Sequence, residues 1–369
     1  MRILFITSEF PPGPGGIGNH AWNLSKYLQG ISKIDILAIS DYSDVNNTIN
    51  FDNRNNLNTH RFKRYLFPFL TQIIRTISVL RFVKNNKYTH CLLSGRFALW
   101  MSCIISYLSS ETKLIAILHG SELKSKNIIY KILLRKSLHY MNNIISVSEF
   151  TEGLIPTIFL RSKKVVIPNG IDYHDLINDE YNIPYTLSGN PRFLTVGSIT
   201  DRKGQVNFIN LLPKIIKKYP RAHYHCVGLK LEEKKIIKLI KKYQLQDHIT
   251  LHGFIENRYL WNIYKQADIL VLLSEVKLLK GVEGFGISIL EANAFGIPAI
   301  GSQGSGIDSA IKHQKTGILA SPYNCNEILD GVEFILKNRN HLSQNAIKWA
   351  QEHDWEIIGK KYAQAIKNA

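Results

Sequence analysis

The feature that most constrains the fold is a regular alternation of short apolar runs with segments of helical spacing. In the first forty residues the apolar run Arg2–Thr7 is followed by a loop rich in glycine and proline, a helical segment over residues 20–28 and a second apolar run over 34–39. Short, continuously apolar runs are typical of parallel strands buried on both faces. Their alternation with helices at this spacing predicts βαβ units and a parallel sheet covered by helices.

The pattern starts a second time after a polar stretch, which predicts two domains. We expect further strands in the first half at residues 90–93, 114–118, 144–147 and 165–167, and in the second half at 193–196, 223–227, 249–251, 269–273 and 299–301. The length of 369 residues supports two cores at ~150 residues per domain.

We therefore predict an α/β protein with two doubly wound domains, over residues 1–172 and 190–350. A helical segment over 351–369 is expected to pack back on the N-terminal domain. Open parallel sheets bind ligands beyond the carboxyl ends of their strands, so we expect the site in the cleft between the two domains.

Composition excludes several other classes of protein. Apolar residues make up 45% and charged residues 20%, which argues against disorder. The four cysteines, Cys91, Cys103, Cys226 and Cys325, form no CxxC pair and indicate core residues in a reducing compartment. No run reaches the ~18 uncharged apolar residues of a membrane span, and the N-terminus does not resemble a secretory signal. We expect a cytoplasmic protein.

A net charge of +17 favours a polyanionic partner such as a nucleic acid, an anionic lipid or a phosphorylated substrate. A nucleic-acid-binding protein would carry basic residues interleaved with exposed aromatic residues, or a known binding module. Neither is evident, so we do not expect nucleic acid as the partner.

The most informative motif is a pair of carboxylates, Glu283 and Glu291, with Gly284 and Gly286 between them. Glycines at a helix start let free backbone N–H groups approach a ligand, and the helix dipole there favours phosphate. At ~1.5 Å per residue the carboxylates lie roughly 12 Å apart along the axis, too far to act on one bond, which needs ~5 Å. They suit the two ends of an elongated ligand, although two exposed glutamates flanking a loop would give the same pattern.

A second motif lies between a strand end and a helix, in residues 196–205 (VGSITDRKGQ), and contains Arg202 and Lys203. A lysine beside a helix N-terminus is a common way to hold a diphosphate. The alternative is an ordinary βα turn whose cations only face solvent.

Two features of the first half follow predicted strands. Residues 13–18 (GPGGIG) form a glycine-rich loop whose backbone could approach an anion closely. Their spacing does not match the dinucleotide motif GxGxxG, and a Walker A lysine is absent. His119 follows the strand at 114–118, where it is either a ligand-facing residue or a structural histidine.

Together these motifs resemble those of retaining glycosyltransferases of the two-Rossmann-domain architecture (GT-B), family 4, over nearly the whole chain. The resemblance rests on Gly15-Gly16, His119-Gly120, residues 147–150 (VSEF), 166–172 (VIPNGID), Arg202-Lys203-Gly204, 251–254 (LHGF), Tyr264, Ala267-Asp268, and Glu283-x7-Glu291 followed by 294–298 (AFGIP). The Glu-x7-Glu pair in this order is its most specific part.

The resemblance implies a nucleotide-sugar donor of the UDP or GDP type as substrate and no separate cofactor. Glu291 would accept hydrogen bonds from the ribose, Glu283 would contact the donor sugar, and His119 would lie near the anomeric carbon. Lys203 would neutralise the diphosphate, with backbone N–H groups of Gly16 and of residues 285–287 completing the anion site. The implied donor-binding residues are Gly16, Arg202, Lys203, Phe285, Gly286, Ile287 and Glu291, and the implied catalytic residues are His119 and Glu283.

One departure from the family pattern concerns an arginine five residues before the lysine, a position that is Ser198 here. We expect Arg202 to supply that charge. We expect no metal, because no DxD pair is present to hold Mg²⁺. The implied mechanism retains the anomeric configuration without a protein nucleophile. A nucleotide-sugar epimerase of the same architecture is the alternative function.

Residues 61–87 carry seven cations, and no Asp or Glu occurs from 53 to 110. Pro68 is expected to start a helix, on which Leu70, Ile73, Ile74, Ile77 and Leu80 form an apolar stripe. Such a helix either packs on its own domain or lies on anionic lipid. We favour peripheral membrane contact, a sugar or lipid-linked acceptor and a role in surface polysaccharide biosynthesis at the cytoplasmic face of the membrane.

Overall fold

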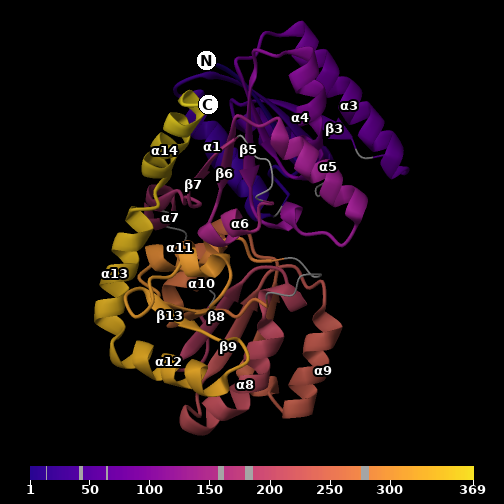
Figure 1. Cartoon of the computed structure of the whole chain (residues 1–369). Coiled ribbons are helices and arrows are strands. Elements are labelled where there is room, and N and C mark those ends of the chain that lie inside the picture. The colour runs from indigo at the N-terminus through magenta and orange to yellow at the C-terminus, as the bar shows by residue number, and fades with distance from the viewer. Residues whose placement is uncertain (14, 41–44, 64, 157–161, 179–185, 276–281) are drawn as a thin grey trace. The chain divides into compact units, whose positions relative to one another are not determined.

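The computed structural model describes the chain except for residues 14, 41–44, 64, 157–161, 179–185 and 276–281. It contains two compact units, each with its own parallel sheet (Figure 1). Unit 1 comprises Met1–Gly170 together with Trp355–Ala369, and unit 2 comprises Ile171–Asp354. The sequence predicted a first domain that ends at residue 172, a second domain over 190–350 and a C-terminal helical segment that begins at 351.

The sheet of unit 1 has seven strands in the order β3-β2-β1-β4-β5-β6-β7, and all neighbouring strands are parallel. The strands are β1 (Arg2–Thr7), β2 (Lys33–Ser40), β3 (Asn58–Lys63), β4 (His90–Ser94), β5 (Lys113–Leu118), β6 (Asn143–Ser146) and β7 (Lys163–Val166). The predicted strands are confirmed, whereas β3 was missed because its sequence, NTHRFK, has no apolar run.

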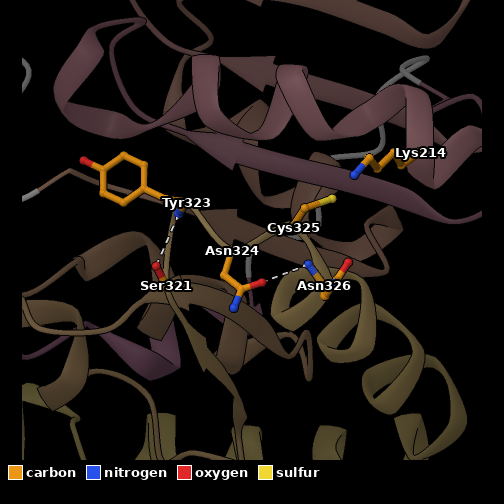
Figure 2. A pocket seen from close by; sticks show the side chains of 6 residues that line it. All are labelled: Lys214, Ser321, Tyr323, Asn324, Cys325 and Asn326. Carbon is orange, nitrogen blue, oxygen red and sulfur yellow. Dashed lines mark hydrogen bonds between the residues drawn. The ribbon is translucent and has the colours of Figure 1, made fainter.

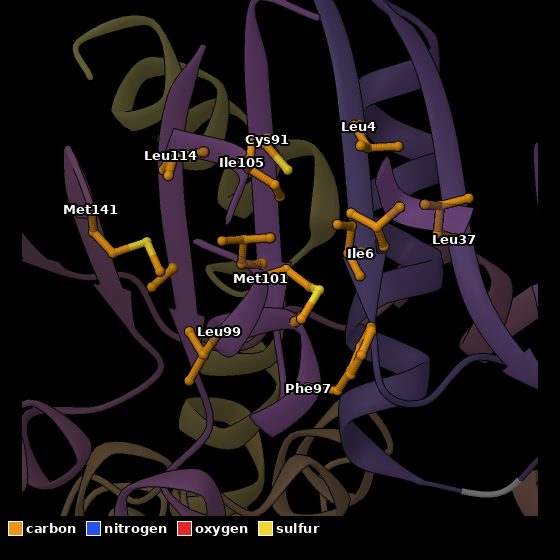
Figure 3. Packing of buried hydrophobic residues seen from close by; sticks show 14 of the residues in the cluster. Leu4, Ile6, Leu37, Cys91, Phe97, Leu99, Met101, Ile105, Leu114 and Met141 are labelled. Carbon is orange, nitrogen blue, oxygen red and sulfur yellow. The ribbon is translucent and has the colours of Figure 1, made fainter. Parts of the chain in front are cut away.

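Alternate residues of β1 belong to different cores, because successive side chains of a strand point to opposite faces. Leu4 and Ile6 lie in the core that Phe97 and Met101 of α4 enter (Figure 3) and that also contains residues of α3 and α5. Ile3 and Phe5 lie in the core that contains residues of α1 and α14. The helices of unit 1 are α1 (Gly16–Gln29), α2 (Val45–Arg54), α3 (Pro68–Asn85), α4 (Arg96–Leu108), η1 (Ser121–Leu123), α5 (Ile128–His139), α6 (Glu149–Gly153) and α14 (Trp355–Lys367).

The sheet of unit 2 has six parallel strands in the order β10-β9-β8-β11-β12-β13. They are β8 (Arg192–Val196), β9 (His223–Val227), β10 (Ile249–Gly253), β11 (Ile269–Leu272), β12 (Ala299–Ser302) and β13 (Gly317–Ala320). The five predicted strands are confirmed, and the four-residue edge strand β13 was not anticipated.

One core of unit 2 lies between the sheet and helices α8, α9 and α12. On the sheet it includes Phe193, Tyr224 and Val271. Helix α11 instead contacts β11, β12 and α13. The helices of unit 2 are α7 (Tyr173–Asn178), η2 (Asp201–Lys203), α8 (Gln205–Lys218), α9 (Glu233–Tyr243), η3 (Gln246–His248), α10 (Asn257–Gln266), α11 (Ile287–Ala294), η4 (Gly306–Ser309), α12 (Cys325–Lys337) and α13 (Arg339–Gln351).

The four cysteines carry free thiols, and Cys91 and Cys226 are buried, whereas Cys103 and Cys325 are partly exposed. Among the described residues no helix is long and apolar enough to cross a membrane.

Candidate active site

The β8–α8 connection of unit 2 is shaped by glycine. Gly204 has φ +77°, and a Cβ there would lie 1.8 Å from the carbonyl oxygen of Leu273, so only glycine fits this close approach. A Cβ on Gly197 would lie 3.0 Å from Cε of Lys203. The lysine side chain therefore runs directly beside the end of β8.

Both cations of this connection meet one carboxylate. Lys203 Nζ lies 2.8 Å and Arg202 NH1 2.6 Å from Glu283 Oε2. Burial alone would raise the pKa of Glu283, but the two cations outweigh it and hold the pKa below its usual value. The arrangement keeps the Glu283 carboxylate ionised in a partly buried place, with Arg202 and Lys203 on the same carboxylate oxygen.

The glycine-rich turn after Glu283 leads into α11. Gly286 has φ +95° and precedes the first helical residue, Ile287, without a side-chain cap. Phe285 is 1% exposed and packs at 6.2 Å from the ring of His353, so its side chain is part of the core. Any contact of this turn with a ligand must therefore come from backbone N–H groups, which the positive end of the helix dipole makes favourable for an anion.

Glu291 lies one turn from the C-terminal end of α11. Its Oε2 accepts a 2.7 Å hydrogen bond from the Tyr264 hydroxyl. Burial raises the pKa of Glu291, which the Tyr264 hydrogen bond and the charge of Lys203 oppose. Lys203 thus acts electrostatically on both glutamates of the motif. Tyr264 was noticed in the sequence only as part of a family pattern, because its partner is 27 residues away.

The open hollow in Figure 2, of about 440 Å³, contains none of these residues. It lies between Lys214 of α8 and the turn that leads into α12, where Ser321 and Asn324 form local hydrogen bonds with the chain that follows. The hollow is wide open, and the side chains of Ser321 and Asn324 already bond to the chain beside them. We therefore regard it as a surface depression and not as a binding site.

In unit 1, α1 begins at Gly16, four residues before the predicted start at residue 20, so residues 16–18 of the expected glycine-rich loop are helical. A Cβ on Gly15 would lie 2.3 Å from Oε2 of Glu9, so a carboxylate lies against this part of the loop. That carboxylate disfavours an anion at the same place.

His119 lies at the end of β5 and is 8% exposed. Its Nε2 is 3.2 Å from the Ser94 hydroxyl, and its backbone N–H donates to Glu122 Oε1 at 2.5 Å. Burial lowers the pKa of His119 to about 4, so the ring is neutral at pH 7. Burial also raises the pKa of Glu122, whose hydrogen bonds oppose that shift.

Two of these neighbours were missed in the sequence. Glu122 has a local signal, since it follows His119 by three residues. His20, on the helix after the glycine-rich loop, contacts the His119 ring at 4.9 Å between centroids. No local pattern indicates that pair. Gly16 and His119 belong to unit 1, and Arg202, Lys203, Phe285, Gly286, Ile287, Glu283 and Glu291 belong to unit 2.

Over the part of the chain that the structure describes, no cluster of three or more His, Cys, Asp or Glu residues is arranged to hold a metal ion. The charges at the β8–α8 connection are compensated within the protein itself.

The two parallel sheets give the chain the fold of the GT-B glycosyltransferases. A crystal structure of Anabaena Alr3699/HepE in complex with UDP has a TM-score of 0.79 with the chain, at 18% identity and 100% coverage of both chains. This likeness establishes the fold.

Family models establish the family. Residues 14–175 match Glycosyltransferase Family 4 and residues 181–353 match Glycosyl transferases group 1. The chain therefore belongs to the glycosyltransferases that these two models describe, its first half matching one model and its second half the other.

Two relatives are similar in sequence. A GDP-mannose-dependent alpha-(1-6)-phosphatidylinositol monomannoside mannosyltransferase of Mycobacterium tuberculosis is 22% identical over 99% of this chain and 98% of its own. An O-antigen biosynthesis glycosyltransferase, WclY, of Escherichia coli is 28% identical over 50% of this chain and 49% of its own.

Proposed function

We propose that the protein is a retaining glycosyltransferase that moves a sugar from a UDP- or GDP-linked donor to a sugar or lipid-linked acceptor in surface polysaccharide biosynthesis. The observation that carries this proposal is the convergence of Lys203 and Arg202 on Glu283, directly before the uncapped start of α11. Two cations and a helix N-terminus suit a diphosphate. The mannosyltransferase and O-antigen relatives support the choice of donor and product class.

Each residue has a role in the proposed reaction. Lys203 and Arg202 stabilise the charge that grows on the diphosphate as its bond to the anomeric carbon breaks. Glu291, held by Tyr264, accepts hydrogen bonds from the ribose hydroxyls, and Glu283 contacts the donor sugar. His119, neutral at pH 7, lies near the anomeric carbon and acts through shape and hydrogen bonding rather than charge.

We propose retention without a protein nucleophile. The bond from the anomeric carbon to the phosphate oxygen breaks, and the acceptor oxygen forms its bond on the same face of the sugar. The acceptor proton passes to the leaving phosphate oxygen. A product whose anomeric NMR coupling shows inversion would overturn this part of the proposal.

The donor is tested by thermal shift with UDP, GDP, ADP and their sugars. A ligand at 100 times its dissociation constant adds about 2.7 kcal/mol of stability, so the right base should raise the melting temperature clearly. Incubation of the donor without acceptor separates the alternatives, because an epimerase would convert it, whereas a transferase only hydrolyses it slowly. Stabilisation by none of the nucleotides would contradict the donor site.

We also propose that catalysis is independent of metal, since two cations already face the diphosphate. Activity should survive EDTA. Loss with EDTA and recovery with Mg²⁺ or Mn²⁺ would contradict this proposal.

A further part of the proposal is peripheral binding to an anionic membrane through the α3–α5 surface, defined as the exposed apolar and basic side chains of these two helices. Helix α3 starts at Pro68, as predicted. It buries Val79 and Val83 in the core of unit 1, so one face of the helix packs on its own domain. Phe69, Ile73 and Ile77 nevertheless remain exposed.

One of the seven cations of residues 61–87 does not lie on the surface, contrary to the prediction. Arg75 is only 3% exposed, and its guanidinium stacks 3.8 Å from the centre of the Phe97 ring. It packs inside the domain because its stem and planar head fit the aromatic face. Arg64 lies outside the described residues. The exposed cations of α3 are Arg81 and Lys84.

Helix α5 also carries exposed apolar side chains with exposed cations beside them. Ile128, Ile129, Ile132 and Leu133 are exposed, with Ile129 at 65%. Lys131, Arg135 and Lys136 on the same helix are exposed as well. The sequence has no Asp or Glu between Glu122 and Glu149, so nothing on α5 repels an anionic lipid. Apolar side chains flanked by cations complement an anionic bilayer, where each surface cation contributes about 1 kcal/mol.

Liposome flotation tests the membrane proposal. Binding should need anionic lipid, weaken with salt, and fall in the double variants Ile129→Ser/Ile132→Ser and Lys131→Glu/Arg135→Glu. The matched control is Lys234→Glu/Lys238→Glu, which makes the same charge change on exposed residues of α9. Equal recovery with neutral vesicles, no recovery with either, or an equal loss in the control would overturn the proposal.

A further inference from the structure

His20 is a buried imidazole that the proposed reaction does not use. It lies on α1 and is 1% exposed. Its Nε2 is 2.8 Å from the hydroxyl of Tyr362, 342 residues away on α14. Its Nδ1 is buried without a hydrogen-bond partner among the described residues. A buried nitrogen without a hydrogen bond lowers the stability of the fold, whereas a phenylalanine ring at the same place would not. Packing alone therefore does not explain why residue 20 is a histidine.

Three aromatic rings enclose the His20 ring. His119 lies 4.9 Å away between centroids with the ring planes at 78°, Trp355 at 5.3 Å and Tyr362 at 5.2 Å, all three in edge-to-face contact. Edge-to-face contacts restrict how each ring can turn. The hydrogen bond to Tyr362 further restricts the orientation of the His20 ring.

The other contact of the His119 ring is less restrictive. Ser94 Oγ lies 3.2 Å from Nε2, and a serine hydroxyl rotates to donate or to accept. Ser94 therefore accommodates either tautomer of His119. The packing of His20 against the ring supplies an orientation that the serine hydrogen bond does not impose.

Helix α14 packs tightly against α1. A Cβ on Gly359 would lie 2.4 Å from the Tyr27 ring, so the two helices approach as closely as glycine allows. Ile358 and Ile366 of α14 are fully buried in the same core. Trp355 and Tyr362 are thereby fixed with respect to His20.

We infer that His20 is a positioning residue for His119, held in place by Tyr362 and Trp355 of the C-terminal helix. The inference rests on the proposed function for the importance of His119 in transfer, but the geometric claim concerns unit 1 alone. The end of the chain thus contributes to a catalytic loop that is more than two hundred residues earlier in the sequence.

The test combines kinetics with NMR of the His119 ring. Tyr362→Phe removes the hydroxyl that binds His20 and keeps the aromatic ring, and His20→Phe removes both nitrogens. The ring signals of His119 are assigned by their loss in His119→Gln. Both variants should shift the ¹⁵N and ¹³C signals of the His119 ring and lower kcat about tenfold at unchanged donor KM, since small misplacements of reacting groups have effects of this size or larger.

Two further variants separate positioning from stability. Tyr88→Phe removes another tyrosine hydrogen bond of unit 1, to Asp35 at 2.7 Å, and should change neither the ring signals nor kcat. His20→Gln keeps a hydrogen-bonding atom for Tyr362 and should retain more kcat than His20→Phe.

Unchanged His119 signals in Tyr362→Phe would overturn the inference, as would an equal loss of kcat in Tyr88→Phe. If the protein transfers no sugar at all, the proposed function fails, and the NMR comparison of Tyr362→Phe with Tyr88→Phe still decides the positioning claim.

Discussion

The loops at the carboxyl ends of the two sheets differ in how they manage charge. In unit 2, Arg202 and Lys203 converge on Glu283, and the two cations hold the pKa of that carboxyl below its usual value in spite of its burial. In unit 1, His119 and His20 are buried, and burial lowers the pKa of each, so both are neutral at pH 7. The ends of two similar parallel sheets thus differ in charge, with ion pairs around Glu283 in unit 2 and neutral, buried imidazoles in unit 1.

The largest effect should come from the charged loop. Lys203→Ala and Glu291→Ala should each lower kcat/KM for transfer at least a hundredfold, about 3 kcal/mol, because the charge that develops on the diphosphate and the ribose contact lose their partners. Lys218→Ala on α8, which breaks an exposed ion pair with Glu333, is the control and should retain activity. Near-normal turnover of either site variant, measured with intact melting behaviour, would break the comparison.

Arg202 should matter less than Lys203, because it is the more exposed of the two cations, at 34% against 14%. We expect Arg202→Ala to lower kcat at least tenfold, about 1.4 kcal/mol. Steady-state kinetics of Ser198→Arg in the Arg202→Ala background should show recovery if one charge can be supplied from either position. Full activity of Arg202→Ala would assign the role to another cation.

Glu283 pairs with Lys203 and Arg202, so at the proposed donor site it would compete with a diphosphate for the same two cations. Glu283→Gln should therefore raise the affinity for a free nucleoside diphosphate about three- to tenfold, by 0.7–1.4 kcal/mol, while transfer from the sugar donor falls. Isothermal titration with the nucleotide, beside kinetics with the full donor, measures both. Affinity that falls together with transfer would show that Glu283 supports the diphosphate site instead of competing with it.

The smallest effect concerns acid stability. His119, His223 and His225 have pKa values lowered to about 4, with burial the largest cause in each case. The unfolded chain binds these protons from about pH 6.5, so stability should be complete above that pH and decline as the pH falls towards 4. The lowered pKa of Glu283 acts in another window, adding stability that is lost only below about pH 4.5.

Melting curves between pH 7.5 and 4.5 should show a loss of several degrees, where about 1 kcal/mol corresponds to about 2–4 °C. His119→Gln should flatten this dependence, and Glu283→Gln should leave it unchanged above pH 5. A melting temperature that is constant from pH 7 to 5 would contradict the neutral, buried state of the imidazoles.

Local sequence pattern was sufficient for much of the fold. The continuous apolar runs identified the buried strands of both sheets, and Pro68 and Gly286 marked helix starts. Proline fixes φ at a value that suits the first turn of a helix, and glycine permits the φ of +95° found at residue 286. The edge strand β3 escaped because its sequence, NTHRFK, has no apolar run. The edge strand β13 escaped because its apolar run, GILA, is only four residues long. The exposure of the cations predicted on α3 was partly wrong, because Arg75 packs against Phe97 of the neighbouring helix α4 instead of facing outward.

The sequence by itself determined the alternation of strands and helices and led us to expect two domains. It also determined which residue types follow the strands, and the diphosphate site was predicted from those residues. Only the tertiary structure decided that Lys203 and Arg202 share one carboxylate, that Arg75 stacks inside its domain, that Phe285 is a core residue, and that His20 joins His119 to α14. Strand and helix preferences act over a few neighbouring residues. Pairing of charges and rings depends on which distant segments pack together, and that follows from burial across the whole domain rather than from local spacing.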